Sequence, residues 1–188
     1  YNFNGVVIYD VERLVLGANL VANFFQDEPN ISPETITVDG QGRTATFNFT
    51  SLSSWGVRLD GWTFTNGNFN INLIGNAESE TFVGTNLADT INAGNGSDQL
   101  HGGAGADTLI GGLGDDYYFT DGLDTIVETA GGGSDWIVVT ESFSLASHTY
   151  IENLDGNSDF AMTLTGNNLN NQITGGWGGD TLYGGIGD

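Results

Sequence analysis

The sequence predicts an all-β fold, a right-handed parallel β-solenoid that is preceded by an irregular β region. Three observations predict it. A phrase of nine residues recurs along residues 75–138 and again along 166–188. The 188 residues include 30 glycines and no cysteine, and the formal net charge is −21. Repetition at a short fixed period is typical of solenoids, in which each unit buries its apolar face against its neighbours.

The repeat is defined by two columns of side chains. Its clearest copies are GGAGADTLI at 102–110 and GGLGDDYYF at 111–119, and the copy at 120–128 lacks one residue in its turn. The sixth position carries an acid or an amide, at Glu80, Asp89, Asp98, Asp107, Asp116, Asp124, Asp135, Asn171 and Asp180. The eighth position carries an apolar side chain, at Phe82, Ile91, Leu100, Leu109, Tyr118, Ile126, Ile137, Ile173 and Leu182.

These columns translate into a coil of two strands and two turns. Three residues centred on the apolar position form a short strand, whose central side chain turns inward because side chains alternate across a strand. The glycines before it permit positive φ and a tight turn. One coil then takes eighteen residues, and alternate copies lie above one another. This places Asp98 beside Asp116 and Asp89 beside Asp107, at a coil spacing of about 4.8 Å.

Packing alone does not hold such turns together. Each coil buries about two apolar side chains, at about 1.5–3 kcal/mol each, whereas ordering the backbone costs about 1–2 kcal/mol per residue. Stacked carboxylates also repel one another. A hard divalent cation that binds carboxylate and carbonyl oxygens removes both problems. Calcium accepts six to eight oxygens in flexible geometry, magnesium requires an octahedron and retains water, and zinc prefers His or Cys. The turns therefore predict several calcium ions.

The repeat resembles the G-G-x-G-x-D-x-U-x nonapeptide of the RTX (repeats-in-toxin), hemolysin-type calcium-binding family. The copies at 102–110 and 111–119 carry this resemblance. It implies a parallel β-roll in which calcium is bound by sixth-position aspartates and by carbonyls of the turns. The carboxylate ligands implied are Asp89, Asp98, Asp107, Asp116, Asp124, Asp135 and Asp180. The carbonyl ligands implied are Gly94, Gly96, Gly103, Gly105, Gly112 and Gly114.

The copies GNAESETFV at 75–83 and GNNLNNQIT at 166–174 depart from the family pattern, since they hold few glycines and place Glu80 and Asn171 at the sixth position. We expect these two copies to end an ion-bound run and not to form full sites.

Four segments are predicted along the chain. Residues 1–74 form an irregular β lead-in, either solenoid-like or a small β-sandwich, because ATFNFT and FNINLI alternate at the period of a strand. Residues 75–138 form the calcium-binding β-roll. Residues 139–165 form a β linker or second lead-in, and residues 166–188 form a second, truncated repeat block. We expect the chain to be part of a larger polypeptide.

Composition and motifs exclude several function classes. Eighteen acids and no lysine or arginine follow Arg58, a surface that repels nucleic acid. No apolar stretch is long enough to span a membrane. The nucleophile-elbow, zinc-hydrolase and phosphate-loop motifs are absent from the sequence. His101 and His148 are therefore interpreted as structural or surface residues, and no catalytic residue is expected.

The sequence thus predicts a calcium-binding, non-enzymatic module of a secreted bacterial protein, extracellular or at the cell surface, which folds on calcium after export. The family resemblance also implies type I secretion. The alternative is an accessory module of an extracellular adhesin or polysaccharide-active enzyme. In that case residues 1–74, with Trp55 and Trp62, would contact a glycan or another surface ligand.

Overall fold

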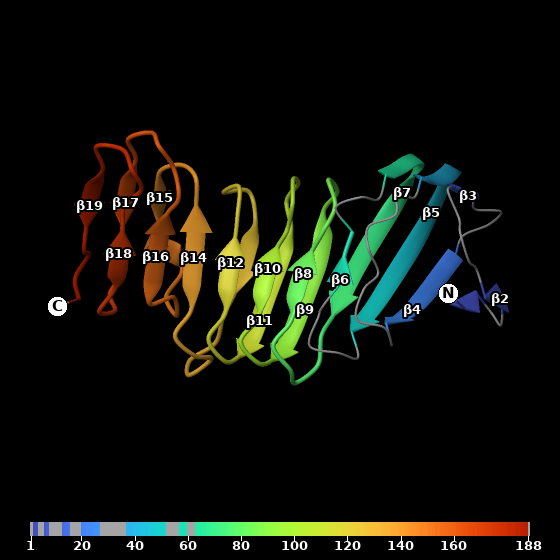
Figure 1. The fold of residues 1–188 in the computed structure, drawn as a ribbon, viewed down its shortest axis with the longest axis horizontal. Coiled ribbons are helices and arrows are strands. Elements are labelled where there is room, and N and C mark those ends of the chain that lie inside the picture. The colour runs from blue at the N-terminus through green and yellow to red at the C-terminus, as the bar shows by residue number, and fades with distance from the viewer. Residues whose placement is uncertain are drawn as a thin grey trace.

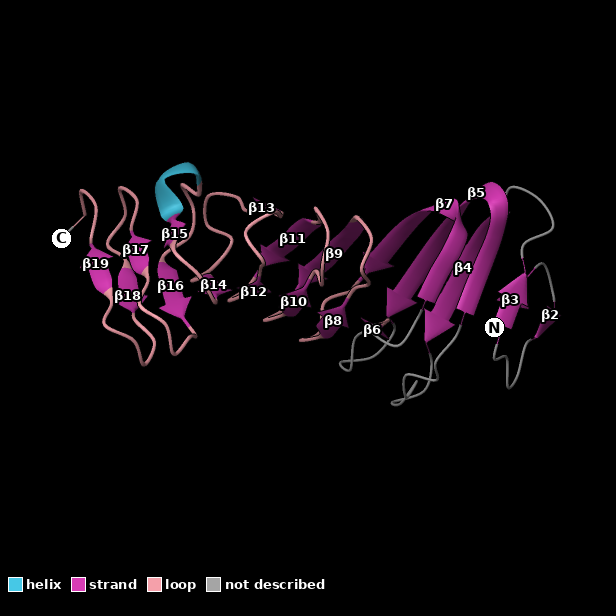
Figure 2. Ribbon diagram, turned by 90° about the horizontal axis from the view of Figure 1, so that it is seen from above, coloured by secondary structure: helices cyan, strands magenta, loops and turns pink. Residues whose placement is uncertain are grey.

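The protein is an elongated all-β solenoid, which confirms the predicted fold class (Figure 1). The computed structural model describes the backbone of residues 2–3, 6–7, 13–15, 20–26 and 37–51, and also residues 57–59 and 63–187. Strands follow one another along the long axis, with the amino terminus at one end and the carboxyl terminus at the other. A 3-10 helix, η1 (Leu145–Ser147), lies beside β15 (Figure 2).

Parallel sheets form the faces of the solenoid. One seven-stranded sheet contains β6 (Val57–Arg58), β8 (Thr81–Val83), β10 (Gln99–His101), β12 (Tyr117–Phe119), β14 (Trp136–Val139), β16 (Asn153–Gly156) and β18 (Gln172–Thr174). A second contains β3 (Arg13–Val15), β4 (Leu20–Gln26), β5 (Thr37–Ser51), β7 (Thr63–Ile74), β9 (Asp89–Asn95), β11 (Thr108–Leu113) and β13 (Thr125–Val127). A third contains β15 (Phe143–Ser144), β17 (Thr163–Thr165) and β19 (Thr181–Tyr183). Strands β1 (Asn2–Phe3) and β2 (Val6–Val7) form a separate antiparallel pair.

The strand register confirms that alternate copies of the repeat stack. Leu100 of β10 lies between Phe82 and Tyr118 in the first sheet. Leu109 of β11 pairs in the same way with Ile91 of β9 in the second sheet. Successive copies therefore alternate between two faces, and one coil takes eighteen residues through most of the repeat run.

The eighth-position column forms the core. Six of its side chains are fully buried, namely Phe82, Ile91, Leu100, Leu109, Tyr118 and Ile137. Ile126 and Ile173 are partly buried against them. Leu182 remains 47% exposed, because β19 is the last strand of its sheet and has a neighbour on one side only.

The segments around the repeats continue the solenoid. β5 pairs with β7 and β7 with β9, all in parallel, so the described part of 1–74 fits the solenoid-like alternative. Trp55 and Trp62, the aromatic residues suggested for glycan contact, lie outside the described residues. Residues 139–165 supply β15, β16 and β17, which stack on the repeats on both faces. The division into four segments stays a prediction.

Truncating one core side chain by a methylene tests the inward column. Ile91→Val is expected to destabilise the calcium-saturated protein by about 0.5–1.5 kcal/mol, because Ile91 is completely buried. Ile186→Val, at a residue that is 82% exposed, should change stability by less than about 0.5 kcal/mol. Urea denaturation in saturating calcium measures both. Equal shifts of the midpoint would contradict the inward orientation of the column.

Candidate metal centres in the stacked turns

Glycine is required in the central turns by backbone conformation and by close packing. The glycines at the second and fourth positions of three copies have positive φ, between 102° and 133°, at Gly94, Gly96, Gly103, Gly105, Gly112 and Gly114. A Cβ on Gly112 would collide with the carbonyl oxygen of Gly94, and one on Gly114 with that of Gly96. Backbone carbonyls of one turn thus lie directly against the next turn, as the predicted carbonyl ligands require.

One oxygen of each central aspartate is fixed by the neighbouring coil. The Oδ1 atom accepts a hydrogen bond from the backbone N–H of the sixth-position residue one coil earlier. These bonds join Glu80 N to Asp98 (2.8 Å), Asp89 N to Asp107 (2.8 Å), Asp98 N to Asp116 (2.8 Å), Asp107 N to Asp124 (3.0 Å) and Asp116 N to Asp135 (2.9 Å). The carboxylates therefore form a ladder that is held at a fixed spacing and orientation.

The other oxygen of each central aspartate has no protein partner. Five Oδ2 atoms are buried without a hydrogen bond, those of Asp98, Asp107, Asp116, Asp124 and Asp135. A buried polar atom without a partner costs about 1–3 kcal/mol, and more when it is charged. Unpaired carboxylate oxygens beside turn carbonyls form the hard, all-oxygen donor set that calcium takes. The residues present therefore fit calcium.

Burial makes these carboxyls poor acids when no metal is bound. Desolvation raises the pKa of Asp98 to about 6 and the pKa values of Asp107, Asp116 and Asp135 to about 7. Neighbouring carboxylates add to the effect, since the charges of Asp124 and Asp89 also raise the pKa of Asp107. A bound dication reverses this balance, because it favours the ionised form of every carboxylate near it.

The turns of the first two copies of the first block and of the first copy of the second block are closed by their own residues. The backbone N–H of the second-position residue donates to the sixth-position side chain of the same copy. These bonds join Asn76 to Glu80 (2.9 Å), Thr85 to Asp89 (2.6 Å) and Asn167 to Asn171 (2.8 Å). In the three central copies the second residue is a glycine with positive φ, and the Oδ2 atom has no partner. The second position therefore distinguishes a self-closed turn from an open one.

The structure accordingly places the seven predicted aspartates in three environments. Asp98, Asp107, Asp116, Asp124 and Asp135 form the ladder described above. The Thr85 hydroxyl also donates to the Asp89 carboxylate, with its oxygen 3.0 Å from Oδ2 and 3.1 Å from Oδ1. Asp180 accepts from Met162 N at 2.9 Å in the second block, where Gly176 and Gly178 do not share the positive φ of the central turns.

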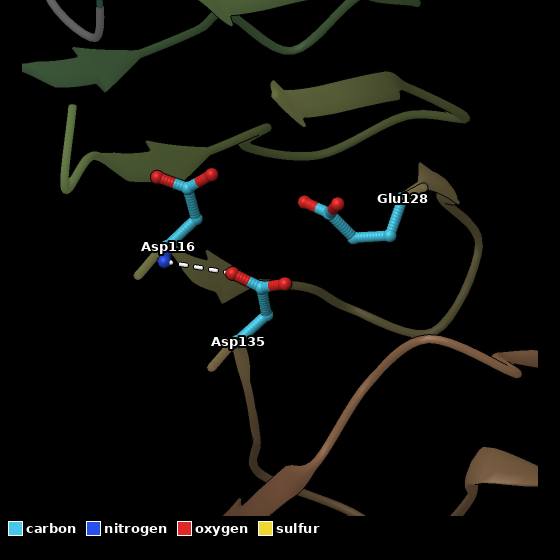
Figure 3. Close-up of side chains that lie close together, drawn as sticks. All are labelled: Asp116, Glu128 and Asp135. Atoms are coloured by element: carbon cyan, nitrogen blue, oxygen red, sulfur yellow. Dashed lines mark hydrogen bonds between the residues drawn. The ribbon is translucent and has the colours of Figure 1, made fainter. Parts of the chain in front are cut away.

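Two further acids occupy the turns and were missed in the sequence. Glu152 precedes β16 as Asp135 precedes β14, and its Oε2 accepts from Asp135 N at 3.0 Å. The signal was present as an acid two residues before Leu154, the spacing of the sixth and eighth positions. Glu128 lies with Asp116 and Asp135 so that oxygens of all three are within 4.8 Å of one another (Figure 3).

The ring contacts of both histidines involve no aspartate of the carboxylate ladder. His101 stacks on Phe119 with ring centroids 3.8 Å apart. The Nδ1 atom of His148 lies 3.2 Å from the hydroxyl of Ser147 at the end of η1. Neither contact brings an imidazole to the buried carboxylates.

The match to a family model agrees with this geometry. The RTX calcium-binding nonapeptide repeat, in four copies, matches residues 74–118 and 163–188. Residues 74–118 and 163–188 are RTX calcium-binding nonapeptide repeats. These repeats are calcium-binding structural units, as the turns indicate. No curated protein and no solved structure matches the chain. In the described part of this chain, no helix is long and apolar enough to cross a membrane.

Proposed function

We propose that this chain is a non-enzymatic calcium-binding module of a secreted protein, and that its β-roll folds when it meets calcium outside the cell. The observation that carries the proposal is the set of five buried Oδ2 atoms without a protein partner. Such a ladder is unfavourable without a cation, because desolvation and mutual repulsion both oppose ionised carboxylates. With a cation bound, the same carboxylates link each coil to the next.

Folding is coupled to calcium binding because the ligands of each ion come from different coils. Each turn contributes only part of a donor set, and the coils meet only in the folded chain. Where a site does not exist in the unfolded chain, the binding free energy becomes folding free energy. Extracellular calcium modules have dissociation constants of about 10⁻⁴–10⁻³ M. With an affinity in this range, the chain would remain unfolded inside the cell, where calcium is scarce, and would fold after export. The RTX repeat match supports secretion and the type I route.

Adhesion or carbohydrate binding through 1–74 gains no support from the described residues or from the family match. A role without catalysis is consistent with the stacked turns, in which Asp107 and Asp116 accept hydrogen bonds from turn backbone. The proposed module therefore acts through rigidity and not through a reaction.

Calcium titration of the 188-residue chain tests the proposal. In chelator, far-UV circular dichroism is expected to show a largely unfolded chain, and calcium should induce a cooperative gain of β signal. Magnesium at the same concentration should have little effect, because it requires octahedral geometry and dehydrates reluctantly. Identical spectra in chelator and in calcium would rule out calcium-dependent folding.

A further inference from the structure

The cluster of Asp116, Glu128 and Asp135 departs from the repeat pattern. The family match ends at residue 118 and resumes at 163, so Glu128 and Asp135 lie in the segment between the matched blocks. The shortened copy loses one residue before Asp124, and two residues, Glu128 and Thr129, are inserted between its strand and the next copy at Ala130. The sixth-position spacing is seventeen residues from Asp107 to Asp124 and nineteen from Asp116 to Asp135. This irregularity brings a third carboxylate to a site that would otherwise have two.

The two aspartates of the cluster are buried and incompletely paired. Asp116 is 0% and Asp135 1% exposed, and the Oδ2 atom of each has no hydrogen-bond partner. Their Oδ1 atoms are already used, since Asp116 accepts from Asp98 N and Asp135 from Asp116 N. Unpaired charged oxygens this deeply buried need a cation or protons. The cluster therefore has an independent indication of a ligand besides its acidic composition.

Glu128 is oriented toward the aspartates by specific donors. The buried hydroxyl of Tyr118 donates to its Oε1, and Thr129 N donates to its Oε2 at 3.0 Å. Gly112 adds a backbone hydrogen bond to the same carboxylate. Each carboxylate oxygen keeps a second lone pair for a metal. Tyr118 occupies an eighth position that carries Phe, Leu or Ile in the other copies, so the hydroxyl and its acid partner occur together here.

The Tyr118 hydroxyl, Asp116 Oδ2 and Glu128 Oε1 all lie close to Gly111. A Cβ built on Gly111 would collide with the Tyr118 hydroxyl and with Asp116 Oδ2, and would lie 2.7 Å from Glu128 Oε1. Only a residue without a side chain leaves this space open. A surface hollow lined by Ile126, Glu128, His148 and Ile151 lies beside this space at Glu128.

We propose that Asp116, Glu128 and Asp135 form a three-carboxylate cation site that binds calcium more tightly than the two-aspartate turns and fills first. This inference rests on the proposed calcium-binding function and assigns Glu128 a role outside the repeat pattern. Calcium affinity rises with the number of charged ligands and with the rigidity of the site. Three carboxylates also match a trivalent ion in charge, so a lanthanide such as terbium should occupy this site before the others.

Terbium luminescence distinguishes this site from the rest, because Tyr118 contacts Glu128 and Trp136 follows Asp135 directly. Terbium added below one equivalent to the calcium-folded chain should displace the ion of this site and produce luminescence sensitised by these aromatic rings. Glu128→Gln, which keeps the shape and an acceptor for Tyr118, should weaken binding of the first equivalent about tenfold or more. Glu141→Gln, at an exposed acid in the same region, serves as the matched control and should leave it unchanged.

Two more variants keep the test decisive. Tyr118→Phe removes only the hydroxyl and should weaken the first equivalent less than Glu128→Gln does. Asp107→Asn alters the ladder at another turn and should leave first-equivalent luminescence intact while shifting the calcium midpoint of folding. Circular dichroism in saturating calcium verifies that each variant is folded.

The outcomes separate the two proposals. If Glu128→Gln folds with calcium yet binds the first terbium equivalent like the parent chain, the three-carboxylate site is refuted and the proposed function stands. If the parent chain shows no calcium-dependent folding, the proposed function fails independently of Glu128.

Discussion

Asp107→Ala is expected to cost about 3–5 kcal/mol of folding free energy in calcium, the loss that follows removal of one partner from a buried charge pair. Asp107 occupies the middle of the ladder. Its Oδ1 accepts from Asp89 N, its own N–H donates to Asp124, and its Oδ2 is one of the five unpaired oxygens. Truncation removes a calcium ligand and leaves the Asp89 N–H without its acceptor.

Asp159→Ala is the matched control for this substitution. Asp159 is exposed and lies outside the repeats, so its truncation should change stability by less than about 0.5 kcal/mol. The measured quantity is the calcium concentration at the folding midpoint, followed by circular dichroism. Asp107→Ala should raise it strongly and Asp159→Ala should not. Equal shifts in the two variants would show that the sixth-position aspartates do not hold the ions.

The regular part of this fold could be predicted because two columns of the sequence map directly onto geometry. An apolar residue every nine positions specifies the inward side chain of each short strand, and Leu100 and Leu109 are fully buried as expected. Glycines at the second and fourth positions specify turns that other residues adopt only with strain. Local conformation and burial are both encoded in the repeat, so periodicity was sufficient for the fold class.

It was harder to predict which carboxylates keep an unpaired oxygen, because this depends on a hydrogen bond within the turn. Asp89 and Asp107 occupy the same repeat position, yet the first is closed by Thr85 and the second is left open beside Gly103. The difference lies in the second residue of each copy. Thr85 directs its N–H at the carboxylate of its own turn, whereas a glycine with positive φ adopts another backbone conformation.

Glu128 could not be placed by counting. It lies where the nine-residue phase is interrupted, and only the structure shows that its carboxylate lies with those of Asp116 and Asp135. A deletion that is compensated by a later insertion preserves the stacking of the coils, but it shifts the acids out of the nine-residue count. Acids close to an interruption of a repeat therefore need a structure before a role can be assigned.

The second large effect is expected from pH: at acidic pH, protons should partly replace calcium in stabilising the folded chain. Burial raises the pKa of Asp89 and Asp98 to about 6 and that of Asp107, Asp116 and Asp135 to about 7. In the unfolded chain these carboxyls titrate near 3.9. Between these values the metal-free folded chain binds more protons than the unfolded chain, so its stability falls as the pH rises.

The stabilising contribution of these protons is complete below about pH 4 and is lost as the pH rises through about 6 to 7. In chelator, β signal in circular dichroism should therefore be strong at pH 5 and weak at pH 8, whereas in saturating calcium it should persist at pH 8. Protons and calcium compete for the same oxygens, so the calcium concentration needed for binding should rise on acidification.

Asp107→Asn combined with Asp116→Asn and Asp135→Asn should reduce both the pH response and the calcium response. A metal-free chain that is equally folded at pH 5 and pH 8 would mean that these carboxyls are not buried as a ladder, since five raised pKa values require a pH-dependent fold.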